Sequence, residues 1–257
     1  MRNGGPPRWQ PRGVVLDLDG TLLDRDESIS GRVADMLRGL SARIPVAIAS
    51  GREPADVRRF ALDLRMTAPQ ISDNGARILD PQTGHTLEEQ TLAPEDAQHV
   101  VAMLAERGMR FFAVDDGRMV QAVEEFGEWR VTVIAGHTGT EEVSLQVQSS
   151  VAERHGVAAV PARDADGVKW YVNFTNAGAN KGAGLRRWSL RTGTSLEGVL
   201  FVGDSYNDLH AFEAAGLPVA MGSAPDEVKR AAQHTVSDVY SDGVAEAVER
   251  FVLPYLS

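Results

Sequence analysis

Four aspartates and their spacing are the strongest chemical signal in this sequence. Asp17 and Asp19 lie two residues apart at the end of an apolar run, so on an extended chain their carboxylates start on the same side. Carboxylates that close repel each other unless a cation lies between them. Asp204 and Asp208 offer further oxygen ligands after a second apolar run. The pattern predicts a Mg²⁺ site, because this hard ion binds carboxylates together with water and phosphate.

Three other residues are suited to binding a phosphoryl group. Ser50 offers a hydroxyl and Gly51 a backbone N–H, which together make a small anion nest, and Lys181 is the best-placed cation. Phosphoryl transfer concentrates negative charge, so catalysis is mostly positioning and charge stabilisation. A carboxylate such as Asp17 could accept the group as an acyl phosphate that water then splits. Asp19 could act as the general acid and base.

These polar residues follow three short apolar runs that are typical of buried strands, at 14–18, 46–49 and 199–202. Helical spacing of apolar residues follows each of them. Alternating strands and helices predict an α/β fold, with a Rossmann-like parallel sheet covered by helices. Ligands bind beyond the carboxyl ends of such strands, so we expect the polar ends of the three strands to meet at one rim.

The middle of the chain has a different pattern, with more strands and fewer helices. We therefore predict an α/β core made of residues 13–79 and 179–257, an inserted α+β cap at 80–178, and a disordered tail at 1–12. The expected cap elements are a hairpin of 77–79 with 85–87, a helix over 97–104, strands at 109–114 and 143–147, a helix around 151–155, and a hairpin of 157–161 with 168–174.

The motifs Asp17–Thr21 (DLDGT), Ser50–Gly51, Lys181 and Gly203–Asp208 (GDSYND) together resemble the four motifs of the haloacid dehalogenase (HAD) superfamily. They come in the family's order with sensible spacing. The insertion is similar to the large α/β cap of the sugar-phosphatase-like branch, subfamily IIB. The segments on either side of it, which include Asn74 and Asn180, are also similar to that branch.

The resemblance implies a role for each motif residue. Asp17 would be the nucleophile and a metal ligand, and Asp19 the acid/base that lends its backbone carbonyl to the metal. Ser50 and Lys181 would bind the transferring phosphate, and Asn207 would steady the phosphate or the water shell of the metal. The implied magnesium ligands are Asp17, Asp19, Asp204 and Asp208.

Three residues have plain structural alternatives. Arg52 follows the Ser-Gly turn and could reach phosphate, but a surface role fits it equally well. Asn74 and Asn180 could contact substrate or simply form turns.

Composition excludes several classes of protein. The net charge of −10 argues against a sequence-independent grip on nucleic acid, which needs clustered Lys and Arg. No apolar stretch approaches the length of a membrane span. The absence of cysteine excludes disulfides and thiolate zinc sites, and it fits a cytoplasmic protein.

The predicted function is a Mg²⁺-dependent phosphatase of a small phosphorylated metabolite, acting through an aspartyl-phosphate. Two alternatives stay open, a phosphomutase and a non-catalytic binder of phosphorylated metabolites. A hexose phosphate, a glycolate-type phosphate, or a flavin or pyridoxal phosphate would each fit as substrate. Caps in this family sometimes pair, which leaves a homodimer open.

Overall fold

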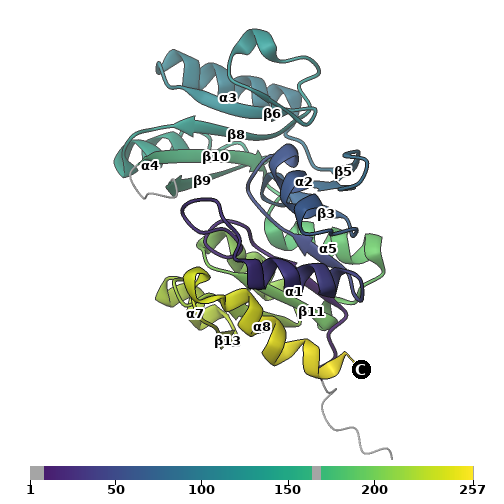
Figure 1. Cartoon of the computed structure of the whole chain (residues 1–257). Helices are drawn as coiled ribbons and strands as arrows, with labels where there is room; N and C mark the ends of the chain where they lie inside the picture. The colour runs from purple at the N-terminus through teal and green to yellow at the C-terminus, as the bar shows by residue number, and fades with distance from the viewer. Residues whose placement is uncertain (1–8, 164–168, 257) are drawn as a thin grey trace, which may run out of the picture.

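The computed structural model describes residues 9–163 and 169–256, and a five-stranded parallel sheet forms the middle layer of its core, with the cap above it in the view of Figure 1. The strand order is β13-β12-β11-β1-β2, which places β1 between β11 and β2. The strands are β1 (Gly13–Leu16), β2 (Val46–Ile48), β11 (Val199–Gly203), β12 (Leu217–Ala220) and β13 (His234–Thr235). The predicted parallel α/β sheet is confirmed.

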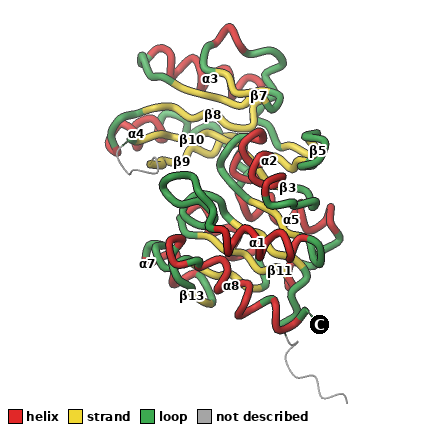
Figure 2. Tube along the Cα trace, in the orientation of Figure 1, coloured by secondary structure: helices red, strands yellow, loops and turns green. Residues whose placement is uncertain are grey.

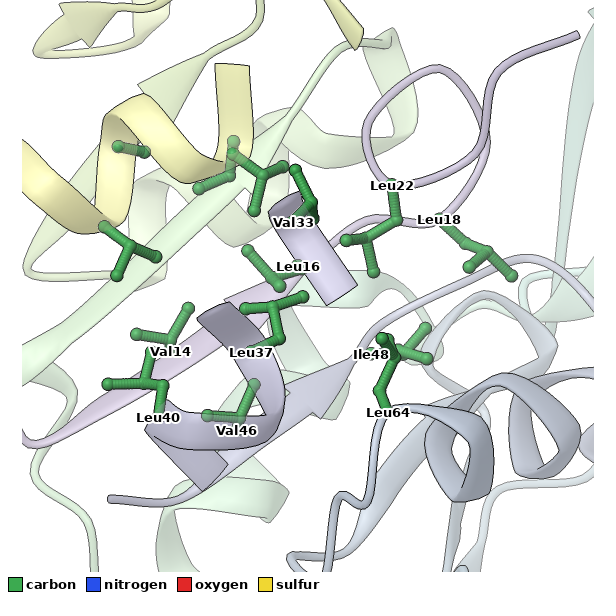
Figure 3. Packing of buried hydrophobic residues seen from close by; sticks show 14 of the residues in the cluster. Val14, Leu16, Leu18, Leu22, Val33, Leu37, Leu40, Val46, Ile48 and Leu64 are labelled. Carbon is green, nitrogen blue, oxygen red and sulfur yellow. The ribbon is translucent and has the colours of Figure 1, made fainter. Parts of the chain in front are cut away.

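Helices cover both faces of this sheet because successive strand residues point to opposite sides. In β1, Val14 and Leu16 pack on one side and Val15 on the other. Figure 3 shows the first of these clusters, where strand residues meet Val33 and Leu37. That side is covered by α1 (Gly31–Ser41), α2 (Pro54–Asp63) and α8 (Gly243–Phe251). The other is covered by α5 (Lys181–Thr192), α6 (Leu209–Ala214) and α7 (Asp226–Ala231).

A second five-stranded sheet, which we call the cap sheet, is antiparallel with the order β7-β6-β8-β10-β9. Figure 2 shows its strands as a group separate from those of the parallel sheet. The strands are β6 (Phe111–Asp115), β7 (Arg118–Val120), β8 (Val131–His137), β9 (Val157–Arg163) and β10 (Trp170–Asn176). Helices α3 (Pro94–Glu106) and α4 (Glu141–Ser149) pack on one face around a third apolar cluster. The other face is free to contribute to a site.

A three-stranded antiparallel sheet joins the two parts of the molecule. It consists of β3 (Gln70–Ser72), β4 (Arg77–Leu79) and β5 (Thr86–Glu89). The β4–β5 pair confirms the expected hairpin after residue 76. An isolated parallel bridge between Ala49 and Ile71 connects this sheet to the end of β2.

Two predictions for the middle of the chain were wrong, and one long strand was not predicted at all. The segment 143–147 is part of helix α4, not a strand, because Thr140 caps the helix by accepting the Val143 N–H and two glutamates occupy its first turn. The segment 151–155 forms turns instead of a helix. Strand β8 was missed, although its run of β-branched residues is a strand signal. Val168, the expected start of one hairpin strand, lies outside the described residues.

Part of the predicted tail is packed against the core. Trp9 donates its indole N–H to the carbonyl of Phe251 at 2.8 Å, and the Arg12 N–H donates to Gly198 at 2.7 Å. Residues 1–8 lie outside the described part of the chain, so the tail prediction is wrong for residues 9–12 only. None of the helices in the described ranges is both long and apolar enough to cross a membrane.

A buried ion-pair network connects β8 to the segment that follows β3. The Arg77 guanidinium donates to Asp73 at 2.9 Å and lies 2.9 Å from a Glu89 carboxylate oxygen. Thr132 of β8 donates its hydroxyl to the same Asp73 oxygen at 2.8 Å. Arg77 and Asp73 are both buried. The cap sheet is therefore fixed to the core by charge as well as by chain connections.

Candidate active site

Three aspartates come together at the carboxyl end of the parallel sheet. Asp17 follows β1, and Asp204 and Asp208 follow the neighbouring strand β11. Their ligand oxygens all lie within 4.8 Å of one another. The strand order causes this arrangement, because adjacent parallel strands deliver their ends to the same rim.

Lys181 supplies a buried positive charge to this group. Its ammonium donates to Asp17 at 2.5 Å and to Asp208 at 2.7 Å, at the first residue of α5. Burial by itself would lower the pKa of Lys181, but the two carboxylates outweigh burial and raise it. Lys181 therefore stays charged. Three carboxylates and one ammonium leave a formal charge of −2.

Asp208 also holds the loop that carries Asp204. One of its oxygens accepts the N–H groups of Asp204 and Ser205, each at 3.0 Å. The other oxygen binds Lys181. A side chain on Gly203 would overlap the Asp208 carboxylate, which explains why glycine ends β11.

The electrostatics of the three-aspartate cluster fit a divalent cation. Burial, followed by repulsion from Asp208, raises the pKa of Asp17 well above its ordinary value and that of Asp204 to about 6. One oxygen of Asp204 is buried without a hydrogen-bond partner among the described residues. The cluster therefore has a formal charge of −2 and a carboxylate oxygen that accepts no hydrogen bond from any described residue. Hard divalent ions bind carboxylate oxygens of this kind.

The raised pKa of Asp204 predicts how pH affects metal-free protein. The unfolded carboxyl has a pKa of about 3.9, so between that value and about 6 the folded state holds a proton that the unfolded state has lost. After chelation we therefore expect the melting temperature to rise as pH falls from about 7 to about 5. The Asp204→Asn variant should show a smaller rise in calorimetry. An equal rise in both proteins would contradict the assignment.

Asp19 lies apart from the three-aspartate cluster and is held by Arg52. The Arg52 Nη2 atom donates to Asp19 at 2.6 Å and to Glu27 at 2.7 Å, and Nη1 lies 3.4 Å from Asp56. These hydrogen bonds, that to Asp19 first, raise the pKa of Arg52 despite its partial burial. The predicted metal role of Asp19 through its backbone carbonyl stays a prediction.

The predicted phosphate-binding residues lie near this site. The buried Ser50 hydroxyl accepts the Arg52 N–H at 3.1 Å, so its proton points elsewhere. Gly51 has open space where a side chain would stand, and with Asn207 it lines the cavity described below. Asn207 accepts the Ser205 hydroxyl at 2.6 Å. Their contacts with phosphate stay predictions.

Asn74 and Asn180 have clear structural roles, one in a turn and the other as a helix cap. Asn74 has a left-handed backbone, with φ of 56°, which asparagine tolerates, and its N–H donates to the Ser50 carbonyl at 2.9 Å. Asn180 caps α5 by accepting the Ala183 N–H at 2.9 Å, which places Lys181 in the first turn. Neither is among the residues that line the cavity, and a role in substrate binding stays a prediction for both.

A cavity of about 620 Å³ separates the aspartates from the cap sheet. The core contributes one wall and the cap sheet the other. The core lining is Asp17, Asp19, Gly51, Arg52, Glu53, Asp56, Asp204, Ser205 and Asn207, and the cap lining is Phe112, Val114, Met119, Val133, Ala162 and Asn173. Period-two alternation places Asn173 and Tyr171 on the same face of β10, but neither composition nor spacing carries a signal that would identify the other cap residues.

Comparison with known proteins agrees with this geometry. Residues 14–145 and 131–248 match the model of the haloacid dehalogenase-like hydrolases. The phosphoglycolate phosphatase of Halobacterium salinarum is 32% identical over 243 residues, which cover 92% of this chain and 96% of that protein.

Solved structures with the same fold include a haloacid dehalogenase-like hydrolase from Bacteroides thetaiotaomicron. It has a TM-score of 0.83 and 24% identity, over 94% of this chain and 99% of that one. The sugar phosphatase BT4131 of HAD subclass IIB has a TM-score of 0.78 and 20% identity, over 93% and 98%. The chain belongs to the haloacid dehalogenase-like hydrolases.

Proposed function

We propose that this chain is a magnesium-dependent phosphatase that hydrolyses a small phosphorylated metabolite through an aspartyl-phosphate at Asp17. The observation that carries the proposal is the group of Asp17, Asp204, Asp208 and Lys181 at the carboxyl end of the parallel sheet, where Asp17 and Asp204 line the cavity. Related proteins support the reaction class, because the similar proteins named above are a phosphoglycolate phosphatase and a sugar phosphatase.

Some of these residues would bind the metal, and others would bind the phosphoryl group. Asp17, Asp204 and Asp208 would hold Mg²⁺, which when bound neutralises charge on the phosphoryl oxygens. Lys181 adds a fixed positive charge that needs no rearrangement, because two carboxylates already orient it. Ser50 and Gly51 offer donors on the opposite side of Asp17, at the end of β2.

The reaction needs a nucleophile and a proton carrier. An oxygen of Asp17 attacks phosphorus, the ester P–O bond breaks, and the leaving oxygen takes a proton from Asp19. Water then attacks the phosphorus of the aspartyl-phosphate and gives a proton to Asp19. This second step releases inorganic phosphate and restores Asp17. Arg52 fixes the direction of the Asp19 carboxylate at the cavity mouth.

Metal removal tests the proposal directly. We expect the purified protein to release inorganic phosphate from phosphomonoesters in Mg²⁺, to lose this activity in EDTA, and to regain it when Mg²⁺ is restored in excess. Phosphate release by a malachite green assay over a panel of metabolites is the measurement. Full activity after exhaustive chelation would contradict the metal assignment, and an isomerised sugar phosphate without free phosphate would indicate a mutase.

A further inference from the structure

Among the residues that the structure describes, the cap wall of the cavity is apolar at every position but one. Phe112 and Val114 lie two apart on β6, so they share a face, and Val114 pairs with Val133 of β8 and with Met119 of β7. Ala162 of β9 adds a further apolar residue to this wall, which lies opposite the aspartates. The polar exception on this wall is Asn173, whose side-chain amide makes no hydrogen bond with any described residue.

The core wall near the cavity mouth is acidic. Glu53 and Asp56 line the cavity beside Asp19. The Glu53 carboxylate is partly buried, yet within the described ranges it has neither a hydrogen bond nor an ion pair. Burial, with smaller contributions from Asp56 and Asp73, raises the pKa of Glu53. No described residue donates a hydrogen bond to this carboxylate, so a bound molecule could supply the donor.

Positive charge is scarce where a leaving group would lie. Among lining residues whose side chains the structure describes, Arg52 is the one cation, and Asp19, Glu27 and Asp56 already bind it. Lys181 lies below, between Asp17 and Asp208. An anionic leaving group would meet carboxylates on one side and apolar groups on the other, at a cost in binding.

We propose that the cavity takes a phosphomonoester whose leaving group is an uncharged, ring-sized alcohol. Its apolar face would lie on Phe112, Val114 and Met119, and a hydroxyl or N–H would donate to Glu53. Asn173 would contact a second polar group from the opposite wall. The inference rests on the proposed phosphatase activity and narrows its substrate class.

The cavity size agrees with this substrate class. A volume of about 620 Å³ has room for a ring beside the phosphoryl group, and it lies within the usual range of small-molecule sites. A two-carbon acid such as glycolate would leave the apolar wall without contacts and its carboxylate without a cation. The likeness to a phosphoglycolate phosphatase therefore does not extend to the leaving group.

Matched substrates separate charge from size. Glycerol 3-phosphate and 3-phosphoglycerate differ by a hydroxymethyl group against a carboxylate, and glucose 1-phosphate and glucuronic acid 1-phosphate differ in the same way on a ring. We expect kcat/KM to be at least about tenfold higher for the uncharged member of each pair. We also expect glucose 1-phosphate to exceed glycerol 3-phosphate, because only the ring reaches the cap wall.

Two variants test the residues named. Glu53→Gln should lower kcat/KM about tenfold for glucose 1-phosphate but leave benzyl phosphate unchanged, because benzyl alcohol has no second donor. Glu53 is the N-cap residue of α2, but its side chain makes no capping hydrogen bond, so the change removes no cap. Met119 is 44% exposed, so Met119→Arg can add a cation to the cap wall without burying it, and it should favour 3-phosphoglycerate.

Glu106→Gln on α3 is the matched control, because Glu106 is exposed and does not line the cavity. It should leave every ratio unchanged. Preference for the anionic member of both pairs, or equal loss on benzyl phosphate and glucose 1-phosphate in Glu53→Gln, would overturn the inference while leaving the phosphatase intact. No phosphate release from any ester in Mg²⁺ would overturn the proposed function itself.

Discussion

Asp17→Asn is expected to abolish phosphate release while the protein stays folded. The amide cannot form the acyl phosphate, so turnover should fall at least roughly 10⁴-fold, as for loss of other catalytic nucleophiles. We expect the folded state to keep its stability, because burial and repulsion from Asp208 already disfavour a charged carboxylate at position 17. The Asn oxygen can still accept from Lys181, which also keeps its bond to Asp208.

The measurements are single-turnover phosphate release and the melting temperature without metal. Asp26→Asn is the control, because it makes the same substitution in an exposed loop near the site. We expect the control to keep wild-type activity, and Asp17→Asn to melt no lower than wild type. Normal turnover by Asp17→Asn would mean that water attacks the substrate directly and that no aspartyl-phosphate forms.

The core site could be predicted from sequence because strand order follows simple rules. Short apolar runs that end in polar residues predict parallel strands, and parallel strands bring Asp17, Ser50 and Asp204 to one rim. The phosphate-binding role of Lys181 could be predicted only together with the other motifs, because a lysine considered alone is usually a solvated surface residue. The structure adds what holds it, which is the pair of carboxylates on Asp17 and Asp208.

The cap was harder to predict because the strand register decides which of its residues line the cavity. Val133 contributes to the cavity only because β8 pairs with β6, and β8 itself was missed. A shift in register beside Val114, of the kind a β-bulge makes, lets Thr132 contact the core and Val133 line the cavity. Neither a bulge nor a pairing partner can be recognised from composition or spacing.

The second large effect is expected at Arg77, which belongs to none of the four motifs. Arg77 is 1% exposed, and it compensates the carboxylates of Asp73 and Glu89, which are 0% and 11% exposed. Burial raises the pKa of Asp73, so this carboxylate depends on the guanidinium and on the Thr132 hydroxyl to remain charged. Removing one partner of a buried ion pair leaves an uncompensated charge in a poorly solvated place.

Arg77→Met should therefore lower the free energy of unfolding by about 3–5 kcal/mol, measured by urea denaturation. Arg186→Met, on the exposed side of α5, is the matched control and should change it by less than about 0.5 kcal/mol. Adding Asp73→Asn to Arg77→Met should recover part of the loss, because asparagine carries no charge and tolerates the φ of 51° at this position. Equal stability of the two arginine variants would mean that the network carries no net energy. The Asp73 N–H also donates to the Arg52 carbonyl at 3.0 Å, which connects the network to the site. We therefore expect Arg77→Met to lower kcat as well as the free energy of unfolding.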